Sequence, residues 1–297
     1  MMSADRFSFD GIGLGELIAG KRLSVPPNQR SYAWEPEHVE DLLRDLNGAI
    51  QKDEKEDYFL GTIVLVRLDG EDVFQIADGQ QRIATTTIIL ARARDILNNL
   101  DRPKRAGAID NKFIQTTDMD TEEIVPQLQL NDEDNQFFRN NVIGKLANSA
   151  DFDAAATLAT QPSNRRLLKA CEVAMSFLHD ILKTFPIEDR ADQILRWVKF
   201  IENKASVVVV TVPDEVGAFR MFETLNDRGL KASQADILKN YLFSRASGAR
   251  LREAQSLWSS MSGTIATLSD DDDDNLVRYT SFLDYKKWAY QGEGASR

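Results

Sequence analysis

The chain has very little cysteine and histidine. It contains one cysteine, Cys171, and two histidines among 297 residues. A single cysteine excludes an intrachain disulfide framework. A zinc site of the ordinary His/Cys kind needs about three or four such ligands. Neither disulfide bridges within the chain nor a His/Cys zinc site is therefore expected.

Long apolar stretches are also missing. No run of about 18 or more apolar residues occurs, so no membrane span is expected. The N-terminus lacks the basic and then apolar pattern of a secretory signal. Together with the scarcity of cysteine, these absences fit a protein of the reducing cytoplasm without a membrane partner.

An excess of basic residues is absent as well. The formal net charge is −11, which rules out a uniformly basic coat for nucleic acid. Any DNA contact must use a local patch, because phosphate affinity depends on the cations that meet phosphates. The chain is 42% apolar, so it can build one large domain or two ordinary ones.

The first hundred residues mix helix and strand. Residues 7–34 read as loops and short strands, and the Gly11–Gly15 segment lacks the spacing of a dinucleotide-binding loop. Apolar residues from Val39 to Leu46 recur at helical spacing. Residues 58–68 and 73–77 read as two strands of a hairpin, and a long helix runs from Asp78 to about residue 97. The region 1–100 is therefore predicted to be α+β.

The remainder is predicted to be mostly helical, with a boundary near residue 101. We expect a strand over 125–130, then a helix that Asn131 and Asp132 cap, and a loose connection over 144–162. Helices follow from Ser163 and over 188–203, and the β-branched run 206–212 reads as a buried strand. Further helix is expected from 214 to about 262, so we assign residues 101–297 to a helical domain that completes the site.

The segment Asp78-Gly79-Gln80-Gln81-Arg82 has the character of an anion site. A strand, a tight turn and a helix start would aim free backbone N–H groups and the positive helix end at one spot. Gly79 lets a ligand approach the backbone, and Arg82 supplies a planar cation. Asp78 either caps the helix or holds Mg²⁺ between itself and phosphate oxygens.

Two further polar clusters accompany this segment. In Pro26–Trp34, Gln29 and Arg30 would face a ligand while the rings of Tyr32 and Trp34 stack on a base or form the wall of its pocket; the alternative is that both rings belong to the core. The second cluster, Phe222–Leu230, is dense in polar groups. The alternative to a ligand site is a capped turn followed by a helix with one solvated face. Its candidate ligand residues are Glu223, Asn226 and Arg228, and the following helix carries Asp236, Lys239 and Asn240.

In this order, the three clusters resemble the GmrSD restriction-endonuclease N-terminal domain family. The matching segments are Pro26–Trp34, Asp78–Arg82, Phe222–Gly229 and Asp236–Asn240, and the resemblance covers roughly residues 10–245. It implies a ParB/sulfiredoxin-like N-terminal domain in which the strand–turn–helix binds nucleotide phosphates. It also implies a role in restriction of modified DNA and antiviral defence against phage, with nucleoside-triphosphate hydrolysis tied to the Asp-Gly-Gln-Gln-Arg segment.

One departure concerns the nuclease. Many relatives continue into a second domain with a His-Asn-His nuclease, and no such motif is visible among these residues, whose histidines are His38 and His179. Three explanations stay open: the chain is a piece of a longer protein, the nuclease is a separate subunit, or the protein does not cut DNA. Neither histidine has a Ser or Cys partner pattern, so no catalytic role is assigned to them.

The first functional hypothesis is a Mg²⁺-dependent nucleoside triphosphatase that regulates a nuclease domain or subunit. Asp78, Arg82 and Glu223 are its candidate catalytic residues, and Asp78 is its candidate metal ligand. Glu223 and Asp78 stay alternatives for holding Mg²⁺ or orienting water. The candidate nucleotide-binding residues are Gly79, Gln80, Gln81, Gln29, Arg30, Asn226 and Arg228.

The alternative hypothesis is a DNA-binding module without turnover that senses modified DNA and recruits a nuclease. Its phosphate contacts would come from a set of cations in the second region. These are Lys104, Arg105, Arg165, Arg166 and Lys169. DNA binding that weakens steeply with salt and ignores nucleotide would favour this alternative.

Overall fold

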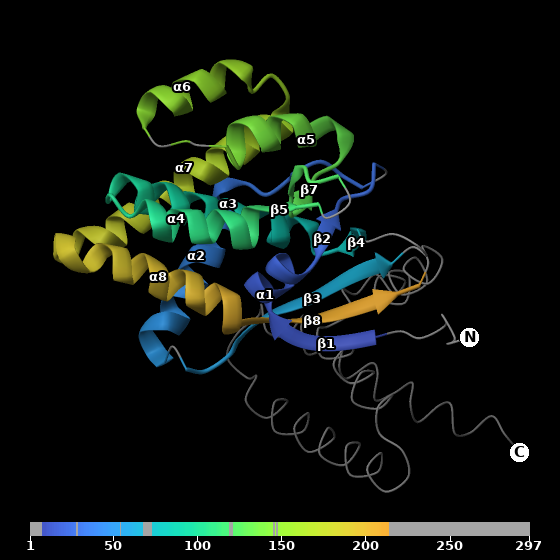
Figure 1. Cartoon of the computed structure of the whole chain (residues 1–297), viewed down its shortest axis with the longest axis horizontal. Helices are drawn as coiled ribbons and strands as arrows, with labels where there is room; N and C mark the ends of the chain where they lie inside the picture. Colours follow the sequence, from blue (N-terminus) through green and yellow to red (C-terminus); the bar gives the residue numbers. More distant parts are fainter. Residues whose placement is uncertain are drawn as a thin grey trace, which may run out of the picture. The chain divides into compact units, whose positions relative to one another are not determined.

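The computed structural model describes residues 8–213 except 28, 54, 68–72, 119–120, 145 and 147. Within these residues the fold is mixed α/β and mostly helical (Figure 1). In chain order the elements are β1 (Ser8–Gly13), α1 (Leu14–Gly20), β2 (Arg22–Ser24), α2 (Pro36–Asp53), β3 (Tyr58–Arg67), β4 (Val73–Asp78), α3 (Gln80–Asn99), α4 (Pro103–Ile109), η1 (Asp110–Ile114), β5 (Gln115–Thr117), β6 (Ile124–Pro126), β7 (Leu128–Gln129), α5 (Asp132–Phe137), η2 (Phe138–Val142), α6 (Ser149–Leu158), α7 (Pro162–Lys183), α8 (Ile187–Asn203) and β8 (Ala205–Val212). Both η1 and η2 are π-helical turns.

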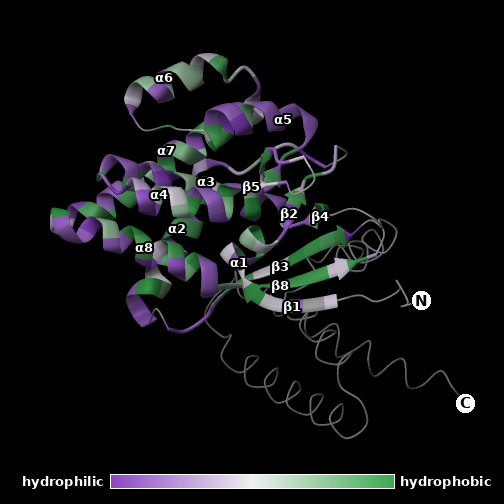
Figure 2. Ribbon diagram, viewed as in Figure 1, coloured by the Kyte–Doolittle hydropathy of each residue, from purple (hydrophilic) through white to green (hydrophobic). Residues whose placement is uncertain are grey.

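The main sheet has six strands in the order β1-β8-β3-β4-β2-β7. β8 pairs antiparallel with β1 and parallel with β3, and β3 pairs antiparallel with β4. The expected strand over 206–212 is confirmed, because β8 lies between β1 and β3 (Figure 1) and Val207 and Val209 are buried. The apolar character of β3 and β8 is visible in Figure 2. The sheet therefore joins residues from both sides of the expected boundary.

Helix α3 is the centre of the core. It is buried along nearly its whole length from Ile83 to Leu97 and packs against α1, α4, α7 and α8. A helix that is buried on every side needs small or apolar residues all round, which its Ile, Ala, Thr and Leu residues supply. The predicted helices α2, α3, α7 and α8 are confirmed with small shifts at their ends.

Three local predictions are wrong. The expected strand over 125–130 is two short strands, β6 and β7, which belong to different sheets. The expected loose connection over 144–162 contains α6, which Asn148 and Asp151 open with a reciprocal capping box. The expected loop Gly11–Gly15 ends β1 and starts α1, and a Cβ on Gly13 would overlap the Glu202 carbonyl oxygen at 1.8 Å. Glycine there permits close packing against α8.

The division into domains 1–100 and 101–297 stays a prediction. Residues 1–214 cluster as one compact unit, and residues on both sides of position 101 share one hydrophobic core. The ParB/sulfiredoxin likeness of the first region also stays a prediction. No described helix is both long enough and apolar enough to cross a membrane.

Candidate functional site

Helix α3 begins at a glycine in a conformation that few other residues adopt. Gly79 has φ 92° and ψ 6°, in the left-handed region, and it is the N-cap of α3. A Cβ at this position would lie 2.2 Å from Cδ1 of Ile63 on β3. Glycine therefore permits both the turn and the close approach of β3. The predicted sequence of strand, turn and helix is confirmed.

The backbone N–H groups at the start of α3 have no side-chain partner. The amides of Gln80, Gln81 and Arg82 lack an intrahelical acceptor because they lie in the first turn. No side chain of the described residues accepts a hydrogen bond from them, and the turn contains no acidic residue. Such amides and the positive helix end favour an anion. Asp78, the last residue of β4, is exposed.

Arg82 is half-buried and lies against β3. Its Nη1 donates to the carbonyl oxygen of Thr62 at 3.1 Å, close to a shift in register between β3 and β8. Burial lowers the pKa of the Arg82 guanidinium, and the nearby Asp78 carboxylate raises it. An arginine nevertheless keeps its charge at neutral pH. Within the described ranges no carboxylate forms an ion pair with Arg82, so its charge is not neutralised by direct contact.

The two glutamines of this turn bind a neighbouring loop. Gln81 Oε1 accepts from the backbone N–H groups of Ala33 at 2.8 Å and Trp34 at 3.3 Å. Gln80 Nε2 donates to the Arg30 carbonyl at 3.2 Å. Both glutamine side chains are buried, although they are polar. The structure thus brings together the first two sequence clusters, which the sequence shows as separate segments.

The loop is fastened by Gln29 and Tyr32 as well. Gln29 Nε2 donates to the carbonyl oxygen of Ala77 at 3.3 Å. The Tyr32 hydroxyl lies 2.7 Å from Oγ1 of Thr85, and burial raises the pKa of Tyr32. Of the alternatives for Tyr32, the structure supports the core one, because its ring is buried in the hydrophobic core and is not available to stack on a base.

Arg30 and Trp34 keep more contact with solvent. Arg30 is exposed, and its side chain has no partner in the part of the chain that the structure describes. Trp34 is half-buried and stacks on His38 with ring centroids 6.1 Å apart. The exposed guanidinium of Arg30 is therefore available to a ligand.

Sequence reasoning did not assign Asn131 and Asp134 to this site. Asp134 is buried, and its Oδ2 accepts from the Tyr32 amide at 2.7 Å. Asn131 caps α5 as predicted, and its Nδ2 also donates to the Gln29 carbonyl at 3.1 Å. The spacing of Asn131 and Asp134 indicates a helix cap, but nothing in the sequence indicates that the cap also holds a distant loop.

The remaining predicted residues lie outside the described residues. These are Glu223, Asn226 and Arg228, together with the helix that carries Asp236, Lys239 and Asn240. Among the described residues, no group of three or more His, Cys, Asp or Glu side chains could hold a metal ion. The metal role of Asp78 and the roles of the other site residues stay predictions. Cys171 is a buried free thiol in α7, and burial raises its pKa to about 11.

Most cations proposed for DNA contact are occupied within the protein. Lys104 is exposed and has no partner among residues 8–213 as described, whereas the other candidates form contacts. Those contacts join Arg105 to Asp192, Arg165 to the carbonyls of Ala159 and Thr160, Arg166 to Glu35, and Lys169 to Glu172. Three of these contacts are ion pairs of largely exposed side chains, which are worth only about 0–1 kcal/mol, so they do not decide against the DNA-binding alternative.

Comparison with known proteins identifies one family. The family model described as "GmrSD restriction endonuclease, N-terminal domain" matches residues 14–243. The match begins at α1 and includes the Asp78–Arg82 segment, the 29–34 loop and the Phe222–Leu230 cluster. No curated protein matches the chain significantly.

Proposed function

The chain belongs to the GmrSD restriction endonuclease N-terminal domain family, and from this premise we propose that it is the nucleotide-binding and NTP-hydrolysing module of a modified-DNA restriction system. In this role it regulates a nuclease that lies in another domain or subunit. The resulting system would act in defence against phage.

The observation that supports nucleotide binding most directly is the start of α3. Its first-turn amides have no described side-chain acceptor, and the first turn itself contains no acidic residue. Together these properties favour a polyphosphate over a neutral ligand. Arg82 in the same turn and the exposed Arg30 add positive charge from two segments that the glutamines hold together.

Gln80 and Gln81 play a positioning role in this proposal. Their side chains hold the backbone of residues 30–34 against α3. The position of the Arg30 backbone relative to the backbone amides of Gln80 and Gln81 is thereby fixed. Pre-organised donors stabilise developing charge without reorganising during the reaction. Arg82, with Arg30 or Arg228, would neutralise the charge that develops on the transferred phosphoryl group.

Mg²⁺ is the expected cofactor, and Asp78 fits it as a carboxylate ligand. Asp78 is exposed and directly precedes the amides of the helix start. Mg²⁺ usually binds one or two carboxylates and takes its other ligands from phosphate oxygens and water. A single carboxylate at this position is therefore compatible with Mg²⁺ that arrives with the nucleotide, and it would shield the charge of the phosphates there.

The test is phosphate release by the full chain with ATP, GTP, CTP or UTP in the presence of Mg²⁺. Arg82→Ala is expected to lower turnover about a hundredfold, as removal of one charge-stabilising donor does in other enzymes. Chelation of Mg²⁺ should abolish release. Arg44→Ala is the matched control, because Arg44 is an exposed arginine of α2 that pairs only with Glu40 and Asp41.

Circular dichroism and urea unfolding establish that each variant is folded. Equal turnover of the wild type and a folded Arg82→Ala variant would reject the proposed role of Arg82. Absence of nucleotide binding, combined with salt-sensitive DNA binding, would instead support the module that senses DNA without hydrolysis.

A further inference from the structure

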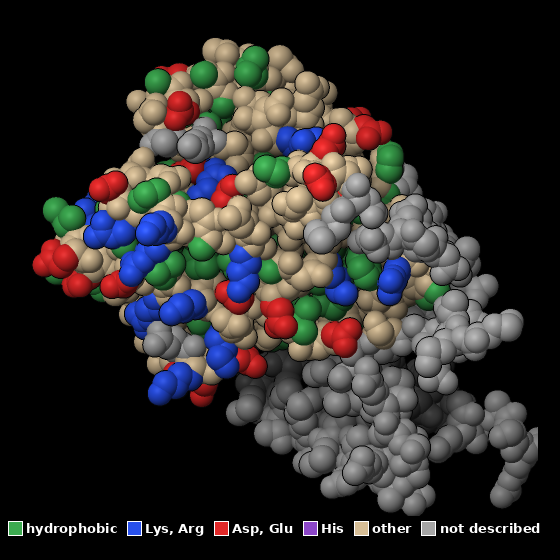
Figure 3. All heavy atoms as spheres, in the orientation of Figure 1, with side chains coloured by type: hydrophobic (Ala, Val, Ile, Leu, Met, Phe, Trp, Pro, Cys, Tyr) green, Lys and Arg blue, Asp and Glu red, His purple; other side chains and the backbone are tan. Residues whose placement is uncertain are grey.

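A second polar groove lies at the far end of α3 from the proposed polyphosphate site. Its volume is about 470 Å³, and it is bordered by the last turn of α3, by α4, η1, β6, η2 and the segment at Ile143 and Gly144. On the face of the molecule drawn in Figure 3, charged and hydrophobic side chains are interspersed with backbone and uncharged polar atoms. The volume falls within the range of small-molecule sites.

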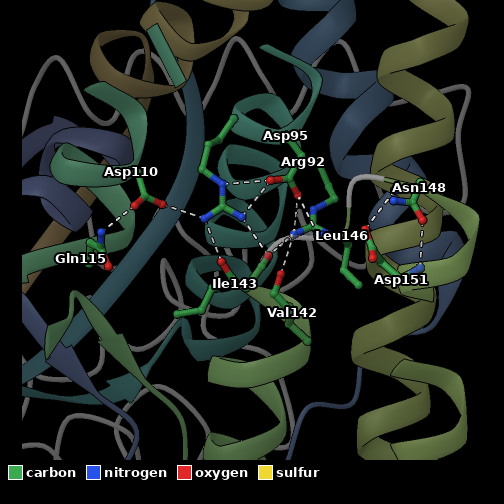
Figure 4. A network of polar contacts seen from close by, with 11 residues as sticks. Arg92, Asp95, Asp110, Gln115, Val142, Ile143, Leu146, Asn148 and Asp151 are labelled. Atoms are coloured by element: carbon green, nitrogen blue, oxygen red, sulfur yellow. Dashed lines mark hydrogen bonds and ion pairs between the residues drawn. The ribbon is translucent and has the colours of Figure 1, made fainter. Parts of the chain in front are cut away.

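An ionic network underlies the groove (Figure 4). Arg94 donates through Nη1 to Asp110 at 2.6 Å and to the Ile143 carbonyl at 2.8 Å, and Asp95 bridges Arg94 and buried Arg92. Gln115 donates to the second carboxylate oxygen of Asp110 at 2.6 Å. Nε and Nη1 of Arg92 are buried without a partner in the described structure, whereas Arg94 and Gln115 bind the two oxygens of Asp110, which therefore does not present a free negative charge to a ligand.

The walls carry polar groups that have no protein partner. The side chains of Asn98, Arg139 and Asn140 line the groove, and none of them bonds to another of the described residues. Two of these groups are amides, which can donate and accept at once, and one is a guanidinium. The charged lining residues are Arg94, Arg139 and Asp110, so the groove has a net charge of +1 in an acidic chain.

Apolar surfaces complete the walls. Pro103 of α4 and Pro126 of β6 line the groove. Ile143 and Ile124 line it as well, and Ile124 is 65% exposed. Flat apolar walls and nearby amides suit the face and the edge of a heterocyclic base, respectively. A guanidinium at the same site suits a phosphate.

Both π-helical turns of the described structure border this groove. η1 contributes Asp110 and Ile114, and η2 contributes Arg139 and Asn140. A π-turn is rare and occurs frequently at functional sites, because it redirects side chains at a cost to the helix. Two of them at one groove are an observation independent of its lining chemistry.

We propose that this groove binds a nucleoside monophosphate unit, with its base between the apolar walls, its base edge on Asn98 and Asn140, and its phosphate on Arg139. The unit comes either from a free mononucleotide or from a nucleotide extruded from a DNA strand. Along α3, positions 80 and 98 are separated by about 27 Å at the rise of an α-helix. The groove is therefore separate from the proposed polyphosphate site and does not depend on it.

Gly107 offers a way to block the groove without disturbing the core. It lies in α4 and lines the groove, and an added Cβ would meet no atom within 4 Å. Gly107→Leu should therefore fill the groove and weaken binding by more than about tenfold. Arg139→Gln should weaken binding about tenfold through loss of a charge-assisted contact. Arg44→Gln is the matched control, because it removes an exposed cation of α2 that does not line the groove.

The experiment is calorimetric titration of the full chain with the deoxynucleoside 5′-monophosphates, and separately with a short single-stranded oligodeoxynucleotide. Inorganic phosphate alone is the control for charge. Binding of either probe that weakens in Gly107→Leu and Arg139→Gln but not in Arg44→Gln supports the proposal. Binding of the monophosphates identifies a free mononucleotide as the source, and binding of the oligonucleotide alone identifies the DNA strand.

An Arg82→Gln variant separates this proposal from the function of the α3 start. Groove binding should survive Arg82→Gln even if triphosphate binding is lost. Binding of both probes that is unchanged in a folded Gly107→Leu variant would overturn the proposal. The proposal also fails if neither probe binds the wild type, or if binding is lost in Arg82→Gln and kept in Gly107→Leu.

Discussion

At the scale of single residues, the side chains and the backbone of the Asp-Gly-Gln-Gln-Arg segment have different roles. Gln80 and Gln81 turn their side chains to the 29–34 loop and leave their backbone amides at the helix start. An acidic side chain in place of Gln81 would also accept from two amides, but it would place a negative charge beside an anion. Glutamine supplies the acceptor without the charge, which gives a physical reason for this residue type.

The first prediction concerns Gln81. Gln81→Leu keeps the volume but leaves the buried amides of Ala33 and Trp34 without an acceptor, so the free energy of unfolding should fall by about 2 kcal/mol. Gln51→Leu is the control, because Gln51 is exposed on α2 and should change stability by less than about 0.5 kcal/mol. Urea unfolding measures both, and equal stability of the two variants would contradict the role of Gln81.

A second prediction compares two glycines. Gly79→Ala should destabilise the fold by about 2 kcal/mol or more, because alanine resists φ 92° and its Cβ would overlap Ile63. Gly48→Ala in the middle of α2 meets no atom within 4 Å and should stabilise by about 0.5–1 kcal/mol. The thermal midpoints of the two variants should therefore shift in opposite directions, and a shared direction would argue against a strained turn at Gly79.

At the scale of elements, α3 links the features that matter for function. Its first turn forms the predicted anion site, its middle fills the core, and its last turns carry the ion network and one wall of the groove. Two arginines in such a helix need a partner, because an uncompensated buried charge is very unfavourable. Asp95 supplies it, since its carboxylate binds Arg92 at 3.0 Å and Arg94 at 2.9 Å.

The third prediction tests this network. Asp95→Asn removes the charge between the buried guanidinium groups of Arg92 and Arg94, and should lower the free energy of unfolding by about 3 kcal/mol at neutral pH. Asp192→Asn breaks an exposed pair with Arg105 and should cost no more than about 1 kcal/mol. Denaturant unfolding measures the free energy of unfolding of both variants. Similar decreases in the two variants would show that burial does not determine how much these ion pairs contribute to stability.

At the scale of the whole molecule, the sheet is completed by a strand from the far end of the described chain. β8 separates β1 from β3, so the first hundred residues alone would leave the middle of the sheet open. The strand is rich in valine and largely buried, which makes its loss strongly destabilising. The N-terminal region therefore depends on a segment about 200 residues from its start.

The fourth prediction follows from this topology. A fragment that ends at residue 204 lacks β8 and should show no cooperative thermal transition, whereas a fragment that ends at residue 213 keeps the sheet and should show one. Circular dichroism against temperature distinguishes the two. Cooperative unfolding of the shorter fragment would mean that β1 and β3 reach a stable sheet without β8, and would support an independent domain over 1–100.

By itself, the sequence determined the local structure around Gly79, the faces of α2, α7 and α8, the buried strand β8 and the family. The structural features follow from periodicity or from short-range chemistry, which a single segment contains, whereas the family follows from the resemblance of three ordered motifs. Only the tertiary structure decided that Gln81 binds the 29–34 loop, that Asp134 holds Tyr32, and that β8 enters the middle of the sheet. These contacts join residues far apart in the chain, and a local pattern of side chains does not encode which distant partner will satisfy a buried polar group or a strand edge.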